Sequence, residues 1–377
     1  MFIAIIIFII TLLVLVVIHE LGHFLVAKQF NIKVLEFGFG IPPRAWGKKF
    51  GETLVSVNWL PFGGFVRLLG EDEVDKSVLD DKRSFASQSV GKRISVVVAG
   101  VVMNLFLAWL LFYLVLGLSN FKADLPLLYN HEFVGANTQI QNSILIQRVQ
   151  DNSPAKLAGL APGMVIKAVN GQTFSSATDL TSQIKNLAGT SMELTVVDSS
   201  TQVESKIKII PRVSPPEGEG ALGVALAEFQ VAKLSYDAPL QKIFSGPIHA
   251  YNLTVYSGGI LGKLIGQSFI DKSFTPVSQT VSGPVGITSV VNSILTESKE
   301  PLIPYLNFVA LLSLNLAVMN VLPFPALDGG RLLFLLIEAI TRKRVKAEVE
   351  KWVHTIGMAI LLTLMLLVTF SDIKKFF

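Results

Sequence analysis

Cysteine is absent from this chain of 377 residues, and histidine occurs only five times. Without cysteine there can be no disulfide framework and no zinc site built from thiolates. A metal ion would therefore have to be held by histidine, aspartate or glutamate side chains. The few histidines are consequently the first candidates for a functional site.

Charged side chains are also scarce. They make up 16% of the chain, against about 25% in typical soluble proteins, while 51% of the residues are hydrophobic. The net charge of +4 comes from Lys and Arg that cluster in loops beside long apolar runs. Membrane topology accounts for that clustering. Composition therefore favours a protein of the lipid bilayer and gives no reason to expect a nucleic-acid partner.

Four segments are long and apolar enough to cross a bilayer, which takes roughly 20 residues. They run from Phe2 to about Ala27, from Ile94 to Leu118, from about Ile303 to Phe324 and from Trp352 to Phe370. The first has no basic leader and no small-residue cleavage site, and its apolar run is too long for a signal peptide. We therefore expect an α-helical polytopic membrane protein with about four transmembrane helices.

The distribution of Lys and Arg predicts the orientation of these helices. Basic residues are frequent in the loop from Lys28 to Arg93 and in the loop between the third and fourth spans. Loops of this kind usually face the cytoplasm. The long segment from about Ser119 to Leu302 is then extracytoplasmic, although Lys374 and Lys375 argue weakly for the opposite orientation.

Within that segment, residues from about Ser143 to Arg212 have the pattern of a small α+β unit. "MVIKAVNG" predicts a strand closed by an Asn-Gly turn, and "SSATDLTSQIKNLAG" predicts a capped helix. The run "NSPAKLAGLAPGMVIKAVNGQTF" resembles the PDZ domains of bacterial envelope proteases. The resemblance implies binding of an extended peptide or C-terminus at a strand edge, with Gly220–Val224 supplying the groove strand. An inert spacer domain is the alternative.

The string "HELGH" at residues 19–23 interrupts the first apolar segment. His19 and His23 are four apart, so on a helix both imidazoles face the same side. Glu20 lies beside them, where it could serve as general base on a water bound to a metal. Ionisable groups inside a span are costly and usually functional. A helix with polar residues facing its neighbours is the structural alternative.

Asp328 is the best candidate for a third ligand. It follows the third span in "NVLPFPALDGGRLL", where Pro323 and Pro325 break the helix. The predicted topology puts Asp328 and both histidines of HELGH near the cytoplasmic leaflet. Broken backbone at that depth requires surrounding protein or water. The remaining histidines, His131, His249 and His354, are less well placed.

HELGH together with "NVLPFPALDG", from Asn320 to Gly329, resembles the site-2 protease family of intramembrane zinc metalloproteases. The single PDZ-like unit resembles the branch of the bacterial regulator of sigma-E protease. The resemblance implies that His19, His23 and Asp328 bind one catalytic Zn²⁺ and that Glu20 is the catalytic residue. It also implies contacts with substrate, made by Asn320, Pro323, Pro325 and, in the second span, Asn104.

Residues 52–71, "ETLVSVNWLPFGGFVRLLGE", resemble the membrane-associated β-hairpin loop of the same family. Asn58 and Trp59 lie on its first arm and are candidates for substrate binding. Such a loop could pair with an unwound substrate by strand addition. An ordinary cytoplasmic hairpin is the alternative.

The implied function is site-2 cleavage of single-pass membrane proteins in the bacterial inner membrane. Anti-sigma factors already shortened by a site-1 protease are the expected substrates, with signal-peptide remnants as a second class. The expected parts are residues 1–118, the PDZ-like part 119–230, a connecting part 231–302 at the membrane surface, and residues 303–377. A membrane-anchored PDZ adaptor with a structural metal site, or a metal transporter, are the alternatives.

Overall fold

The structure is a computed structural model that describes the chain except for residues 72–77, 79–80, 199–203, 274–281, 299 and 377. The chain divides into two compact units. The first comprises Met1–Leu114, His249–Asn292 and Tyr305–Phe377, and the second comprises Val115–Ile248 with Ser293–Pro304. The units are described separately below.

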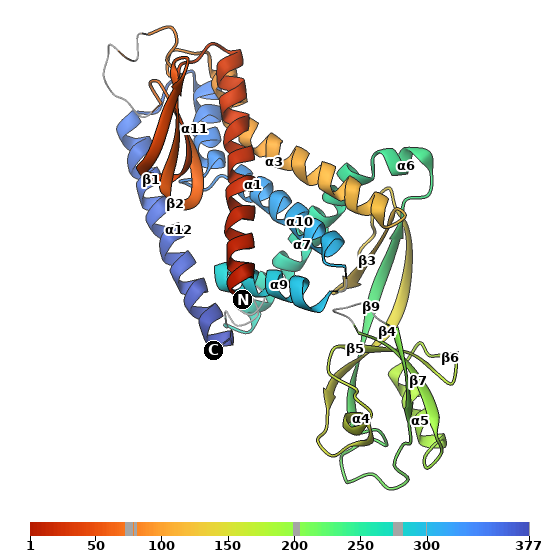
Figure 1. Cartoon of the computed structure of the whole chain (residues 1–377). Helices are drawn as coiled ribbons and strands as arrows, with labels where there is room; N and C mark the ends of the chain where they lie inside the picture. The colour runs from red at the N-terminus through yellow and green to blue at the C-terminus, as the bar shows by residue number, and fades with distance from the viewer. Residues whose placement is uncertain (72–77, 79–80, 199–203, 274–281, 299, 377) are drawn as a thin grey trace. The chain divides into compact units, whose positions relative to one another are not determined.

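Four helices within the described part of the chain are long and apolar enough to cross a membrane (Figure 1). They are α1 (Phe2–Gln29), α3 (Val90–Leu118), α10 (Leu302–Val321) and α12 (Ala347–Phe376). They coincide with the four spans expected from the sequence, with ends shifted by a few residues. The chain is therefore a polytopic membrane protein with an added β-rich part.

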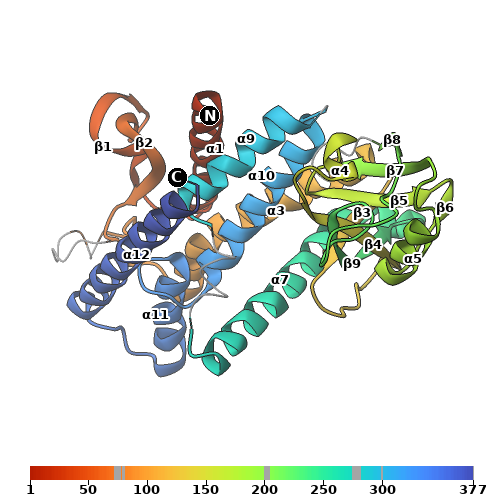
Figure 2. The ribbon, with the colours of Figure 1, turned by 90° about the horizontal axis from the view of Figure 1, so that it is seen from below.

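Shorter or less apolar helices lie between or beside these four in the sequence. The segment expected at the membrane surface forms α6 (Pro239–Ile243) and α7 (Ser245–Ile270). They are followed by α9 (Pro284–Glu297) and α11 (Asp328–Thr341). Figures 1 and 2, two views at right angles, both show α11 and α12 side by side.

A twisted β-hairpin follows α1, formed by β1 (Val34–Phe50) and β2 (Thr53–Leu68). The sequence analysis predicted a strand–turn–strand within residues 52–71 but not β1. In the structure the two ends of β2 flank β1, because Phe37 lies opposite both Val55 and Val66. The segment 64–68 therefore forms one edge of this small sheet.

The base of the hairpin is fixed at the end of α1. Apolar side chains of α1, the hairpin, α3 and α11 form one buried cluster, made up of Ala27, Ile32, Val34, Leu68, Phe85, Val96, Val97 and Leu335. At the β1–β2 turn, Glu52 accepts hydrogen bonds from Arg83 and from Lys28. These two bonds hold the pKa of the Glu52 carboxyl at about 2. Packing and charge together fix where edge 64–68 runs.

The second unit contains an antiparallel β-sheet with the strand order β3-β9-β4-β5-β7-β8. The strands are β3 (Lys122–Leu127), β4 (Asn137–Val149), β5 (Met164–Val169), β7 (Met192–Asp198), β8 (Glu204–Ile209) and β9 (Val224–Ser235), with the short β6 (Gln172–Thr173) paired to β5. Two short helices, α4 (Pro154–Leu157) and α5 (Ala177–Asn186), complete the unit.

Local sequence explains much of this unit. Asn170 and Gly171 both adopt positive φ, as the Asn-Gly turn between β5 and β6 requires. Ser176 caps α5 by accepting the N–H of Thr178. Leu180 and Ile184, one turn apart on α5, are buried in a core with Ile144, Ile146 and Leu194 of the strands.

Candidate metal centre

The two histidines of HELGH lie on the same face of α1, one turn apart. Their Nε2 atoms are 3.2 Å from each other. α1 runs without a break from Phe2 to Gln29, so the spacing of four residues alone aligns the two rings. His19 is buried, which removes it from competing water.

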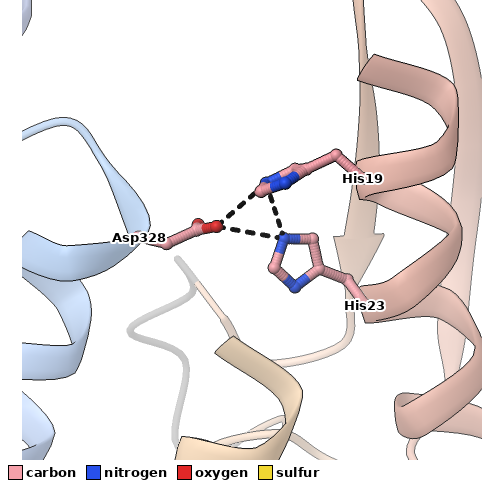
Figure 3. A group of neighbouring side chains, drawn as sticks. All are labelled: His19, His23 and Asp328. Carbon is pink, nitrogen blue, oxygen red and sulfur yellow. Dashed lines mark hydrogen bonds and ion pairs between the residues drawn. The ribbon is translucent and has the colours of Figure 1, made fainter. Parts of the chain in front are cut away.

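Asp328, the first residue of α11, completes a triangle with these rings. Its Oδ2 lies 2.9 Å from His19 Nε2 and 3.3 Å from His23 Nε2. Figure 3 shows the three side chains pointing toward one another, two from α1 and one from α11. The structure thus brings together side chains that are about 300 residues apart in the chain.

The triangle has the dimensions of a metal site. A tetrahedral zinc ion with bonds of about 2.0–2.1 Å separates its ligand atoms by about 3.4 Å. The observed separations of 2.9, 3.2 and 3.3 Å are close to that value. His19, His23 and Asp328 therefore fit three coordination positions of one tetrahedral ion and leave the fourth for water or substrate.

The orientation of the His23 ring is fixed by a hydrogen bond of its other nitrogen, Nδ1. Its Nδ1 lies 2.7 Å from the carbonyl oxygen of Val96 on α3. A carbonyl oxygen can only accept, so Nδ1 carries the proton and donates it. In the neutral ring the lone pair is then on Nε2, which faces Asp328 and His19.

Glu20 lies in the same cavity as the metal-site residues. The cavity has a volume of about 340 Å³, and its lining includes Glu20, His23 and Asp328. This volume is enough for several water molecules. A carboxylate beside the three ligand side chains can therefore reach water in the same space.

The hairpin edge forms another wall of this cavity. Phe65, Val66, Arg67 and Leu68 all line it. A side chain at Gly64 would place its Cβ 3.5 Å from Glu20 Cγ, so the edge begins directly beside the glutamate. No other strand of the described chain pairs with the outer side of segment 64–68. The Leu68 N–H donates to Glu71 Oε2, and the rest of this edge has no strand partner among the described residues.

The helix α3 approaches the two histidines through a glycine. A Cβ at Gly100 would lie 2.4 Å from His23 Nε2 and 2.7 Å from His19 Nε2. Nearby, a Cβ at Gly22 of α1 would lie 2.3 Å from the carbonyl oxygen of Ala99. Small residues at both positions let α3 lie directly against α1 at the two histidines. The sequence analysis missed both, because nothing local distinguishes them from other glycines in a span.

A second pair of glycines allows the chain to turn back before Asp328. A Cβ at Gly329 would lie 2.0 Å from the carbonyl oxygen of Leu322, and one at Gly330 would lie 2.5 Å from that of Phe324. Neither glycine has a positive φ. Close backbone approach, and not a left-handed conformation, therefore requires glycine at both positions.

The other residues named from the sequence lie outside the lining of this cavity. Asn104 is buried on α3, its carbonyl oxygen accepts from Ser313 of α10, and its side-chain amide has no partner among the described residues. Asn58 donates to the carbonyls of Phe39 and Gly40 within the hairpin. Trp59 is 71% exposed.

Asn320 is half-buried near the end of α10, Pro323 is exposed, and Pro325 is half-buried in the broken segment before Asp328. Two of the remaining histidines have other surroundings. His249 packs its ring against Phe112, with ring centres 5.2 Å apart. His354 contacts the broken segment and is taken up below.

Two histidines and an aspartate whose ligand atoms meet, with a glutamate that lines the same cavity as His23 and Asp328, are the constellation of a metallopeptidase. The sequence model of peptidase family M50 matches residues 7–364. The chain belongs to this family, so the expected membership of the site-2 protease family is confirmed.

Named relatives agree with this assignment. A Clostridium acetobutylicum protein named as a zinc metalloprotease is 33% identical over 360 residues, covering 96% of this chain and 94% of its own. The regulator of sigma-W protease RasP of Bacillus subtilis is 28% identical over 448 aligned positions, covering 98% of both chains. Zinc metalloprotease RasP of Geobacillus kaustophilus is 28% identical, covering 99% and 98%. The predictions of a zinc metalloprotease and of a zinc cofactor are therefore confirmed.

Substituting Gly100 should disturb the metal centre. In Gly100→Ala the new methyl group would meet both histidine rings, and we expect zinc affinity to fall by about 10–100-fold, as for other changes behind metal ligands. Gly91→Ala is the matched control on the same helix, because a Cβ there meets nothing within 4 Å. Competition with a chelator measures the affinity, and an unchanged value in Gly100→Ala would contradict the packing argument.

Proposed function

We propose that His19, His23 and Asp328 hold one catalytic zinc ion and that Glu20 is the general base and acid of peptide hydrolysis. The observation that carries this assignment is the triangle of ligand atoms with edges of 2.9 to 3.3 Å, at a cavity that Glu20 also lines. Three protein ligands leave one position open, which is typical of catalytic and not of structural zinc sites.

The roles of the side chains follow from this arrangement. When bound, zinc acts as a Lewis acid on the scissile carbonyl and makes a water molecule nucleophilic near neutral pH. Glu20 accepts the proton of that water and returns it to the leaving amine, so the same carboxyl acts first as base and then as acid. The Val96 carbonyl keeps His23 in the tautomer that this site needs.

We propose that the substrate reaches the site as an extended strand. A transmembrane helix hides its peptide bonds in hydrogen bonds, so it must be unwound before hydrolysis. Edge 64–68 offers backbone donors and acceptors along the wall of the cavity, beginning next to Glu20. Strand addition at this edge would hold the unwound segment across the catalytic residues.

The remaining substrate-binding assignments are proposals of the same kind. The buried amide of Asn104 has a free donor and a free acceptor among the described residues, which suits a peptide backbone. Exposed Trp59 suits contact with a substrate or lipid. Asn58 would act indirectly, because its amide donates hydrogen bonds to the carbonyls of Phe39 and Gly40 within the hairpin. Asn320, Pro323 and Pro325 would act from the segment that leads to Asp328.

The distribution of basic residues supports an active site near the cytoplasmic leaflet and a β-rich unit on the extracytoplasmic side. We further propose that this unit is a PDZ-like domain that receives a peptide at β9. Strand β4 pairs with β9 from Val224 to Ser235, but β3 pairs only with Gln230–Ser235. The half from Val224 to Phe229 therefore has an open edge among the described residues.

The substrates we propose are single-pass membrane proteins, with anti-sigma factors first. The relative in Bacillus subtilis is named a regulator of sigma-W protease. A shortened single-pass protein would present a new C-terminus outside and a helix inside, which suits the open edge of β9 and the edge 64–68. Signal-peptide remnants also present an apolar helix within the bilayer and are the second class of substrate that we propose.

Substituting Glu20 and the ligand Asp328 in separate variants tests the catalytic assignment. Glu20→Gln should lower cleavage of a single-pass membrane substrate by about 10²–10⁴-fold, because it removes the base, while zinc stoichiometry stays that of the wild type. Asp328→Ala should lose both zinc and cleavage. Metal analysis by mass spectrometry and cleavage in detergent or liposomes measure both properties. Wild-type turnover in Glu20→Gln would overturn the assignment, and a metal-bound wild-type protein that cleaves none of the single-pass substrates would favour an adaptor.

Local helix stability in the substrate should control its cleavage. Replacing two alanines near the cleaved bond with glycines weakens a helix by about 1 kcal/mol per residue. If unwinding precedes hydrolysis, kcat/KM should rise by up to about 30-fold. The two substrates are compared by single-turnover cleavage, with Glu20→Gln as the background control. Equal rates would show that the substrate need not unwind before reaching Glu20.

A free C-terminus should matter at the PDZ-like unit. We expect a fluorescent peptide with an apolar C-terminal residue to bind the full chain, and its C-terminal amide to bind about tenfold more weakly, since one charged hydrogen-bonding group is lost. Fluorescence anisotropy measures both. Equal affinities would contradict carboxylate recognition, and no binding of either peptide would favour an inert spacer.

A further inference from the structure

The segment that carries the metal-binding aspartate is an unusual piece of backbone. Between the end of α10 at Val321 and the start of α11 at Asp328, the chain contains Pro323 and Pro325. Ala326 adopts φ 75°, a left-handed conformation that costs a residue with a side chain of order 1–3 kcal/mol. Such a conformation persists only where neighbouring structure imposes it.

The last span supplies a hydrogen bond at this residue. Nδ1 of His354, on α12, lies 2.9 Å from the backbone nitrogen of Ala326. A backbone N–H can only donate, so Nδ1 is the acceptor and carries no proton. The donor lies two residues before Asp328, in the part of the segment with the unusual φ.

A second contact comes from the same face of α12. Gly357 is three residues after His354, and a Cβ there would lie 2.3 Å from Pro325 Cβ and 2.8 Å from the Pro325 carbonyl oxygen. The backbone of α12 therefore touches Pro325 directly. Two adjacent residues of the segment, Pro325 and Ala326, are held by two residues of one helical turn.

These contacts stand out because few residues of α12 are fully buried. Among the residues of α12 whose burial is described, only Gly357 and Asp372 are buried. Asp372 lies near the other end of the helix, where its carboxylate accepts the N–H groups of Gly283 and Gly286 at 2.8 Å each. The helix is thus anchored at two points, and one of them is the segment before Asp328.

We propose that α12 is the template on which the metal-binding segment is held, and that His354 is the positioning residue. The hydrogen bond from Ala326 to His354 and the contact of Gly357 with Pro325 fix the course of the chain into Asp328. They thereby aim its carboxylate at His19 and His23. This inference rests on the proposed zinc site, and His354 itself touches neither metal nor substrate.

Three variants at and beside His354 test the proposal in the full chain. His354→Ala removes the acceptor, and His354→Asn keeps one, because the amide oxygen of Asn reaches a position close to that of Nδ1. Thr355→Ala is the control, since Thr355 is exposed and its hydroxyl bonds only within its own helix, to the Lys351 carbonyl. Zinc affinity, the thermal midpoint of the metal-free protein and kcat are measured for each.

We expect His354→Ala to bind zinc about 10–100-fold more weakly, the range found for residues behind metal ligands. Its metal-free thermal midpoint should stay near that of Thr355→Ala, and kcat should fall at limiting zinc. His354→Asn should recover most of the affinity. Gly357→Ala should weaken zinc binding by displacing Pro325, whereas Gly258→Ala, where a Cβ meets nothing within 4 Å, should not.

Unchanged zinc affinity in both His354→Ala and Gly357→Ala would overturn the proposal. A loss of affinity in His354→Ala that Asn does not restore, together with a lower metal-free midpoint, would also overturn it, since that is the behaviour of general destabilisation. Asp328→Ala separates this failure from failure of the zinc site. If Asp328→Ala binds zinc like the wild type, the proposed site itself is wrong and the inference fails with it.

Discussion

The structure is organised around one constraint: the Asp328 carboxylate, which follows the third span, must come within about 3 Å of two imidazoles on the first helix. Ordinary residues between helices keep their axes about 8–10 Å apart, and at this site the backbones approach more closely than a Cβ would allow. Glycine removes the obstacle at each approach. Gly22 and Gly100 bring α3 against α1, and Gly329 brings α11 against the end of α10.

The same constraint explains why irregular backbone occurs where it does. Segment 322–327 leaves peptide groups outside any helix, which in a bilayer is acceptable only beside protein or water. The Ala326 N–H is satisfied by His354, and Asp328 lines the cavity. In the hairpin, by contrast, edge 64–68 has backbone groups without a strand partner, and it lies beside the same cavity. One edge is left open where a substrate strand can close it.

The sequence predicted those features that are local. Spans follow from long apolar runs, and His19 and His23 share a face because four residues make about one helical turn. Asp328 followed from two prolines and a depth argument. The strand β1 was missed because "IPPRAWGKK" has two adjacent prolines and no regular alternation. Gly100 and His354 gain their importance only from what packs against them, which periodicity cannot reveal.

The strand edge beside Glu20 has a consequence for specificity. Edge 64–68 can pair only with a segment whose backbone donors and acceptors are free, and a helix uses its own in internal hydrogen bonds. Such an edge would select the conformation of a substrate before it selects its sequence. An enzyme of this kind would read the helix–coil equilibrium of its target, so that membrane segments whose helices rarely open are spared even when their residues are acceptable.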